Sequence, residues 1–255
     1  ELWMSDGPHG VRAEINWNDW GYAGWTNDSC TAFPALTCLA ASWNPLLAEK
    51  YGIAIGEEAR YREKDVLLGP GVNIYRTPLN GRNFEYMGED PYLASELCVP
   101  YIQGVQKNGV AACVKHYALN NQELWRGHID VQLSDRALYE IYLPAFKAAV
   151  ERGKAWSIMG AYNKVRGTHA THHKLLNNDI LKGEWKFDGC VITDWGAAHD
   201  TYEAAMYGLD IEMGSYTNGL TSESEFGYDD YYLGKSYLKM VREGKIPMEV
   251  VNDKA

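Results

Sequence analysis

With 255 residues, 46% of them hydrophobic, the chain can bury a sizeable core, and we expect a single α/β domain over residues 1–255. Its formal net charge of −10 argues against nucleic acid and anionic membrane surfaces as partners, because proteins that bind these polyanions usually present a basic patch. No run of about 20 apolar residues occurs, so we expect a soluble protein, with the choice between cytoplasm and a secreted compartment left open.

Five cysteines are present without CxxC or Cys/His spacing, which disfavours a zinc site and a dense disulfide framework. We expect most of them to be small buried hydrophobes, while Cys30 and Cys38 can pair if the compartment is oxidising. Nothing in the sequence indicates a metal or another cofactor.

Short apolar runs alternate with longer helical patterns, which is typical of βα units around a parallel sheet. The runs predicted as strands are residues 66–68, 110–114, 156–159 and 190–192. This order favours a TIM-type (β/α)8 barrel, incomplete or irregular at its N-terminus. A doubly wound sheet is the alternative, but its glycine-rich phosphate-binding fingerprint is missing.

The predicted helices have recognisable ends. Asn44 is expected to cap a helix that runs to about residue 60, and further helices are expected over residues 90–107 and 229–243. Ser134 is expected to cap one continuous helix that reaches Val150 and ends at Gly153. Its predicted buried face comprises Leu138, Ile141, Tyr142, Ala145, Phe146 and Ala149. The long polar segments 12–31 and 120–132 are predicted as loops that carry function.

Polar residues follow the predicted strands directly. The run 190–192 leads into Asp194 and Trp195, and a barrel would place both at the carboxyl ends of its strands, where such folds keep their active sites. From the residues alone, Asp194 can be a nucleophile, a metal ligand or a helix cap. Lys115 and His116 follow the run 110–114 in the same way, with a salt-bridged surface pair as the alternative.

Further polar groups are expected at the same edge. Tyr162 follows the third strand, and Arg82 lies in a glycine-containing turn. Asp6 begins a turn-forming segment near the start of the chain, for which a plain turn without function is the alternative. Charged groups that hold hydroxyls and an aromatic platform for a sugar ring are what a carbohydrate pocket needs. The motifs of zinc proteases, serine hydrolases and P-loop proteins are absent from the sequence.

Seven stretches, in this order, give the chain a close resemblance to the N-terminal domain of glycoside hydrolase family 3. They are Met4–Arg12, Gly69–Ile74, Pro78–Glu85, Lys115–Glu123, Asp135–Phe146, Met159–Asn163 and Thr193–Ala197. The resemblance implies a retaining β-glucosidase that releases terminal β-D-glucose from β-glucosides or cello-oligosaccharides through a covalent glycosyl-enzyme. It implies no cofactor.

The resemblance also implies roles for single residues. Asp194 matches the nucleophile, and Trp195 matches the neighbour that lines the first sugar site. The residues that match hydroxyl-binding positions are Asp6, Arg82, Lys115 and His116. Tyr162 matches a tyrosine beside the nucleophile, and Met159 a methionine of the pocket wall. An aspartate at the place of Asp6 favours glucose over xylose.

The chain departs from the family pattern at some positions. Arg166 stands before Gly167 where the family often has Asn-Gly, and Lys186 stands where a glycine is common. The chain opens at the Asp6 segment and breaks off within what resembles the last barrel helix. We therefore expect a fragment that lacks a following α/β domain, in the same polypeptide or a companion chain, which supplies the acid/base glutamate.

Alternative functions stay open. They are a β-xylosidase or a β-N-acetylhexosaminidase of the same family, and a sugar-binding module without turnover. The hexosaminidase is disfavoured because the segment Tyr117–Asn121 lacks the Asp-His dyad of that subgroup.

Overall fold

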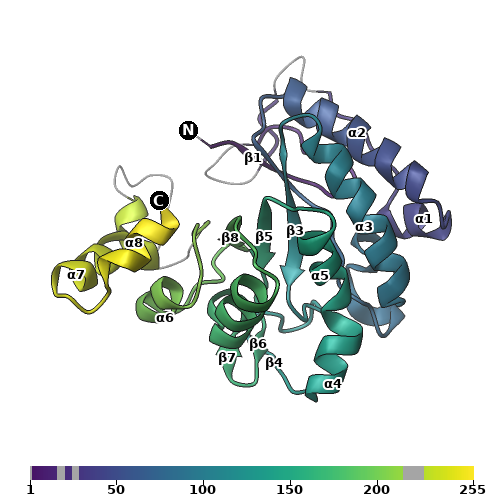
Figure 1. The fold of residues 1–255 in the computed structure, drawn as a ribbon. Helices are drawn as coiled ribbons and strands as arrows, with labels where there is room; N and C mark the ends of the chain where they lie inside the picture. The colour runs from purple at the N-terminus through teal and green to yellow at the C-terminus, as the bar shows by residue number, and fades with distance from the viewer. Residues whose placement is uncertain (1, 16–20, 25–28, 215–226) are drawn as a thin grey trace.

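The computed structural model describes residues 2–15, 21–24, 29–214 and 227–255. At its centre lies a five-stranded parallel sheet of order β1-β2-β3-β5-β8 (Figure 1). The strands are β1 (Met4–Asp6), β2 (Val66–Leu68), β3 (Ala111–Tyr117), β5 (Ser157–Gly160) and β8 (Cys190–Thr193). All four predicted strands are confirmed to within a few residues at their ends.

Helices cover one face of this sheet, as the alternating pattern predicted. The α-helices before β5 in the chain are α1 (Leu36–Ala41), α2 (Pro45–Tyr61), α3 (Pro91–Gln106), α4 (Asp135–Ala137) and α5 (Pro144–Glu151). The α-helices after β8 are α6 (Thr201–Met206), α7 (Tyr237–Arg242) and α8 (Met248–Lys254). Asn44 caps α2 and Asp90 caps α3, each by accepting two backbone N–H groups of the first turn. No helix of the described ranges is both long and apolar enough to cross a membrane.

The two faces of the sheet bury different sets of side chains. Leu67, Val114, Ile158 and Val191 point towards the helices and belong to the main core. Residues one position away in the strands form a separate apolar cluster on the other face, which comprises Val66, Leu68, Cys113, Met159 and Ile192. This alternation follows from the two-residue period of a strand, and it leaves the second face free to line a pocket.

The parallel α/β arrangement is confirmed, whereas a closed ring of eight strands is not seen among the described residues. The outer edge of β8 carries one further parallel bridge, between Ile192 and Ile211. Figure 1 shows α7 and α8 beyond this edge, with α6 between them and the sheet.

The expectation of one continuous helix from Ser134 to Val150 is wrong. Ser134 does cap α4, but a π-helical turn over Leu138–Tyr142 follows, and α5 starts afresh at Pro144. Proline has no N–H to donate, so the preceding turn widens and Leu143 N–H bonds to the carbonyl of Leu138. The wider turn rotates the predicted face, so that Ile141 is 40% exposed while Leu138 stays buried.

The C-terminal helix predicted over 229–243 is shorter than expected. Helical turns over Gly227–Asp230 and Tyr232–Ser236 precede α7, and Leu233 and Gly234 have non-helical backbone angles. Part of the predicted loop 12–31 lies outside the described residues.

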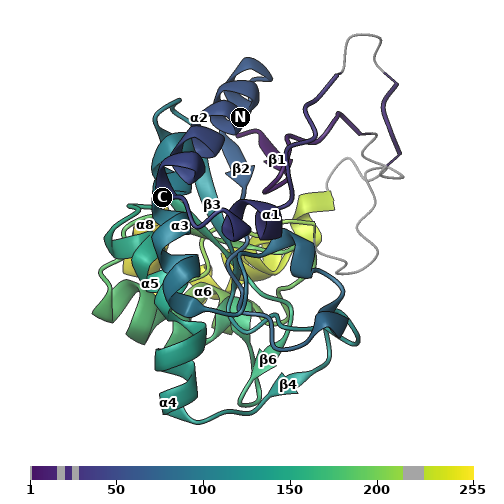
Figure 2. The same ribbon diagram turned by 90° about the vertical axis from the view of Figure 1, so that its right-hand side faces the viewer.

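A small second sheet combines one strand that precedes β5 in the sequence with two that follow it. It consists of β4 (Asp130–Val131), β6 (Lys164–Val165) and β7 (Thr168–His169), at the edge of the molecule farthest from the N-terminus in Figure 2. Arg166 and Gly167 connect β6 and β7 with φ values of 50° and 94°, so Arg166 occupies a left-handed position that suits asparagine better. Lys186, the other departure from the family pattern, has φ 57°.

The prediction that most cysteines are buried is wrong. Cys98 and Cys113 are buried, whereas Cys30, Cys38 and Cys190 are exposed. All five are unpaired, including Cys30 and Cys38.

Candidate active site

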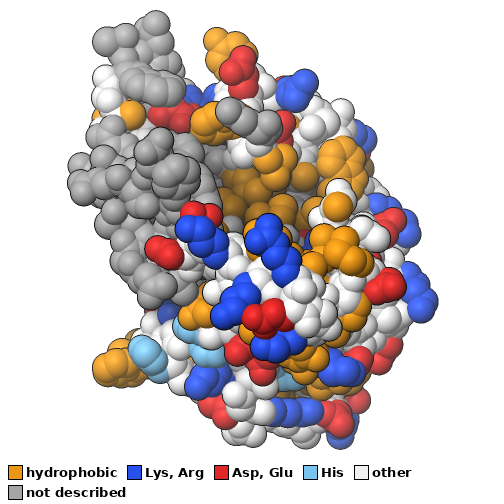
Figure 3. Space-filling view, turned by 90° about the vertical axis from the view of Figure 1, so that its left-hand side faces the viewer, with side chains coloured by type: hydrophobic (Ala, Val, Ile, Leu, Met, Phe, Trp, Pro, Cys, Tyr) orange, Lys and Arg blue, Asp and Glu red, His pale blue; other side chains and the backbone are white. Residues whose placement is uncertain are grey.

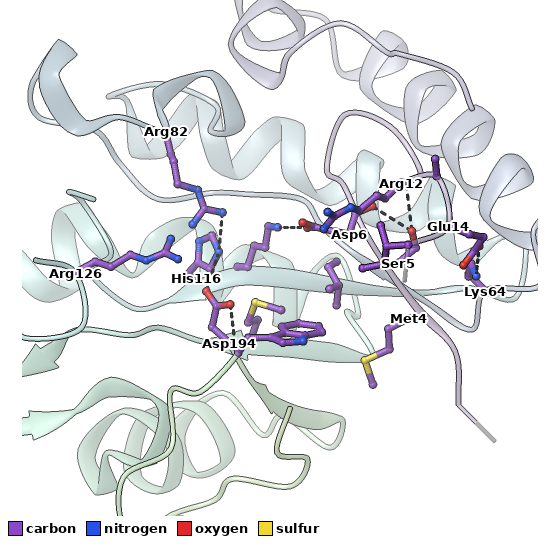
Figure 4. Close-up of a pocket in the computed structure, with 16 residues that line it drawn as sticks. Met4, Ser5, Asp6, Arg12, Glu14, Lys64, Arg82, His116, Arg126 and Asp194 are labelled. Atoms are coloured by element: carbon purple, nitrogen blue, oxygen red, sulfur yellow. Dashed lines mark hydrogen bonds and ion pairs between the residues drawn. The ribbon is translucent and has the colours of Figure 1, made fainter. Parts of the chain in front are cut away.

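A cavity of about 480 Å³ opens on the second face of the sheet and at the carboxyl ends of its strands. It contains Asp6, Arg82, Lys115, His116, Met159, Asp194 and Trp195, which are seven of the eight predicted site residues. In Figure 4, Arg82, Arg126, His116 and Asp194 lie together at one end, and the Glu14–Lys64 ion pair lies at the other. Figure 3 shows hydrophobic side chains lining a hollow, with Lys and Arg side chains beside it.

A bulge in β3 brings two consecutive residues into the cavity. Successive side chains of a regular strand point to opposite faces, so Lys115 and His116 would not share one. The pairing of β3 with β5 shifts by one residue between Val114 and Tyr117. Both side chains therefore line the cavity, and both are buried, at 2% and 1% exposure. The surface-pair alternative for Lys115 and His116 is wrong.

Lys115 is held between two carboxylates. Its Nζ lies 2.8 Å from Oε1 of Glu85 and 3.1 Å from Oδ1 of Asp6. Burial by itself would lower the pKa of Lys115, but Asp6 and Glu85 outweigh burial and raise it. For Asp6, burial by itself would raise the pKa, but the positive charges of Lys115 and Arg82 have the larger effect and lower it. All three groups are therefore charged at neutral pH.

Arg82 shares Glu85 with Lys115. Its Nε and Nη2 lie 2.7 and 2.9 Å from the two oxygens of Glu85, a bidentate pair that fixes the plane of the guanidinium. Gly81, with φ 99°, allows the sharp turn before Arg82, and a β-carbon there would crowd Glu123.

His116 is neutral, and its contacts define its tautomer. Burial and the cations Arg82, Lys115 and Arg126 hold the pKa of His116 well below its ordinary value. Nη2 of Arg82 lies 3.2 Å from His116 Nε2, and a guanidinium only donates, so Nε2 accepts. The proton is then on Nδ1, which donates to the hydroxyl oxygen of Tyr86 at 3.0 Å.

Asp194 follows β8 at the carboxyl end of the sheet, as predicted. Its N–H donates to Gly160 O, and its Oδ1 accepts the N–H of Trp195 at 2.8 Å. The helix-cap alternative is wrong, because the next helix, α6, starts at Thr201 and is capped by Asp200. Burial raises the pKa of Asp194. The charges of Lys115 and Arg82 and the hydrogen bonds from the Trp195 N–H and Tyr162 lower it, but burial has the larger effect and the pKa stays raised.

Tyr162 is the one predicted residue outside the cavity lining, although it bonds to Asp194. The guanidinium of Arg126 lies over its ring, 4.3 Å from the ring centroid. Arg126 also donates to Glu123 at 2.7 Å and lines the cavity.

Sequence reasoning did not single out Arg12, Glu85, Tyr86 and Arg126. Arg12 and Glu85 close two of the motif stretches, and Tyr86 follows directly, so the stretches themselves carried a signal for all three. Arg126 lies in the segment 120–132, which the length of the loop had marked as functional.

Comparisons with known proteins identify the family. The sequence profile of the glycosyl hydrolase family 3 N-terminal domain matches residues 17–255. The β-glucosidase BoGH3A of Bacteroides ovatus is 99% identical over 255 residues, which are 100% of this chain and 34% of that protein. An exo-α-(1→6)-L-arabinopyranosidase of Bifidobacterium longum is 46% identical over 220 residues, or 84% of this chain and 28% of that protein.

Solved structures agree as well. β-Glucosidase 3B from Thermotoga neapolitana, in complex with α-D-glucose, matches with a TM-score of 0.87 at 40% identity, covering 98% of this chain and 34% of that one. Sheet, cavity and relatives together define a glycoside-hydrolase domain. The chain belongs to glycoside hydrolase family 3, which confirms the resemblance seen in its motifs. It spans about a third of the length of the relatives that it matches.

Proposed function

We propose that this chain is the nucleophile-bearing part of a retaining β-glucosidase, with Asp194 as the attacking carboxylate. The observation that carries the proposal is the position of Asp194 at the end of β8, in one cavity with Lys115, His116 and Arg82. A carboxylate at the floor of such a site can attack the anomeric carbon, and the surrounding donors can hold the sugar hydroxyls that orient it.

The substrate is proposed to be a β-D-glucoside or a cello-oligosaccharide. The names of the relatives support glucose, and the cavity offers Asp6 and Lys115 as a paired acceptor and donor for neighbouring hydroxyls. The arabinopyranosidase among the relatives makes α-L-arabinopyranosides the second candidate. An α-L-arabinopyranose ring lacks the hydroxymethyl group of glucose and has the opposite configuration at C4, so the two substrates differ at the C4–C5 edge of the sugar.

The acid/base residue is proposed to come from polypeptide beyond this chain. The leaving oxygen needs a carboxyl group that is protonated at the working pH. Asp6 and Glu85 are poor sources, because Lys115 and Arg82 outweigh the effect of burial and lower the pKa of both carboxyls. The relatives are about three times longer than the chain, which leaves room for a second domain that brings this glutamate.

A complete (β/α)8 barrel is proposed for the full-length protein. The bridge between Ile192 and Ile211 supports a further parallel strand beside β8. The apolar cluster on the second face of the sheet, with Met159 and Ile192, supports packing of the remaining strands around a shared interior.

The experiment that tests the function is hydrolysis of chromogenic glycosides by the full-length polypeptide. We expect kcat/KM for an aryl β-D-glucoside to exceed that for the matching α-L-arabinopyranoside and β-D-xyloside. A higher kcat/KM for the arabinopyranoside or the xyloside would show that the substrate assignment is wrong. Binding of glucose without any turnover would indicate a sugar-binding module instead.

Residues 1–255 alone provide a second test. Without a general acid, they should hydrolyse an alkyl β-glucoside negligibly, since such acids contribute about 10²- to 10⁴-fold. An activated fluorinated glucoside needs little protonation and should label Asp194 slowly. A label on another peptide, or efficient cleavage of the alkyl glucoside, would contradict the assignment.

A further inference from the structure

Glu85 is the shared partner of the two cations that lower the pKa of the proposed nucleophile. Its side chain is buried, and it contacts Nζ of Lys115 at 2.8 Å and Nε of Arg82 at 2.7 Å. Within the part of the chain that the structure describes, Arg82 has one other carboxylate contact, a looser one with Glu123 at 3.6 Å. The carboxylate of Glu85 therefore fixes the position of both cations.

Asp194 is the competing partner for these cations. Lys115 and Arg82 already lower its pKa across the cavity, so both act on it electrostatically. No ion-pair contact joins Lys115 or Arg82 to Asp194 among the described residues, and burial keeps the net pKa of Asp194 raised. An ammonium group that moved onto Asp194 would stabilise the carboxylate and weaken it as a nucleophile.

We propose that Glu85 is a positioning residue that holds Lys115 and Arg82 away from Asp194, and so keeps the nucleophile unpaired and reactive. The inference rests on the proposed function of Asp194. Glu85 acts through the two cations, which stay aimed at the sugar hydroxyls instead of closing on the carboxylate.

The two sides of this balance are visible in the charges that face each group. Lys115 is surrounded by Glu85, Asp6, Arg82 and neutral His116. Asp194 faces Lys115, Arg82, His116 and the hydrogen-bonding groups of Tyr162 and Trp195. Without the charge of Glu85, buried Lys115 keeps its contact with half-exposed Asp6, and Asp194 is a further carboxylate on which its charge already acts.

The test is Glu85→Gln in the full-length polypeptide, which keeps the size of the side chain and removes its charge. We expect kcat for an aryl β-glucoside to fall about 10²-fold, the loss that an ångström of misplacement typically causes. We also expect the acidic limb of the kcat/KM profile to move to lower pH, because Lys115 now stabilises ionised Asp194. A role in folding alone would leave that limb in place, and loss of the Glu85 charge without movement of Lys115 would shift the limb equally with and without Lys115.

Controls separate this effect from a general loss of an Arg–Glu pair. Glu96→Gln breaks the bidentate pair with Arg152, which is remote from the cavity, and should keep the wild-type profile. The double variant Lys115→Met/Glu85→Gln buries no unpaired ammonium group. The limb should move less from Lys115→Met to the double variant than from the wild type to Glu85→Gln, because only Arg82 is then left to move towards Asp194.

The outcomes are distinguishable. An unchanged limb in Glu85→Gln would overturn the inference, and so would shifts of equal size with and without Lys115. If Glu85→Gln does not fold, an unchanged limb between Lys115→Met and the double variant would overturn the inference, because Arg82 remains free to move towards Asp194. Absence of β-glucosidase activity in the wild-type polypeptide would instead overturn the proposed function.

Discussion

His116 Nε2 lies 3.5 Å from Oδ2 of Asp194, close enough for an ion pair, yet the imidazole is neutral. His116 therefore does not form an ion pair with Asp194 and does not stabilise its carboxylate by a positive charge. Burial is the largest influence on its pKa, and the net effect is a pKa above the ordinary value of 3.8. The proposed nucleophile is thus a carboxylate that resists ionisation in acid.

This relationship predicts an acidic limb in the pH–rate profile. Attack requires ionised Asp194, so kcat/KM should fall as the pH drops through a pKa that is raised above that of a free aspartate. The profile of the full-length polypeptide on an activated aryl glucoside measures it, because chemistry on such a substrate depends little on the acid. A limb below the ordinary aspartate value would contradict the burial argument.

Replacing the nucleophile gives the second prediction. Asp194→Ala should lower kcat by about 10⁴-fold or more while glucose still binds, because Asp6, Arg82 and Lys115 remain in place. Calorimetric titration with glucose measures binding, and azide should restore part of the turnover by attacking through the vacated space. Asp188→Ala, an exposed carboxylate ahead of the same strand, is the control. Near-normal kcat in Asp194→Ala would reject the assignment.

The sequence was informative where a chemical group follows a strand directly. Asp194 and the Lys115–His116 pair could be predicted because apolar runs lead straight into them, and parallel strands bring their carboxyl ends to one edge. The bulge in β3 could not be predicted, since no residue type in the run 111–117 marks it. Tyr86 was missed because its function depends on His116, which lies in β3, 30 residues further along the chain.

The prediction of one helix from Ser134 to Val150 was wrong for a related reason. Hydrophobic periodicity from Ser134 onwards fits an α-helix, but a π turn adds one residue without changing the composition. Pro144 was the available signal, because a proline inside a helical pattern disrupts the preceding turn. The exposure of Ile141 is the direct consequence.

The third prediction concerns the departure at Lys186. This exposed residue has φ 57°, a left-handed conformation that costs a non-glycine residue about 1–2 kcal/mol. Lys186→Gly removes that strain but adds backbone entropy to the unfolded chain, so we expect a net gain of about 0.5–1 kcal/mol. Urea unfolding measures the change. Lys50→Gly, at an exposed position within α2, should instead lose about 1 kcal/mol.

The fourth prediction is a loss of stability in acid that centres on His172. This buried histidine accepts the backbone N–H of His199 at Nε2, so its proton is on Nδ1, which lies 2.9 Å from Oε2 of Glu203. Burial, together with His169 and His199, lowers the pKa of His172 to about 4. Protonation of Nε2 would also break the hydrogen bond that this atom accepts from the N–H of His199, which adds to the effect of burial.

The sign of the effect follows from proton uptake. The unfolded chain binds a proton at His172 near pH 6.5, whereas the folded chain does so near pH 4, so the unfolded state gains protons first as the pH falls. The free energy of unfolding should therefore decrease between these two values, by at most about 3 kcal/mol from this residue. Below the lower value, its contribution should level off.

The comparison of wild type with His172→Gln isolates that contribution. Glutamine offers a donor and an acceptor but does not titrate, so the variant should lose less stability between pH 6.5 and 4 than the wild type. Urea unfolding at several pH values measures both slopes, and His128→Gln, which removes an exposed ring, controls for the loss of an imidazole. Parallel slopes for wild type and His172→Gln would mean that His172 takes up its proton equally in both states, and that Glu203 compensates its burial after all.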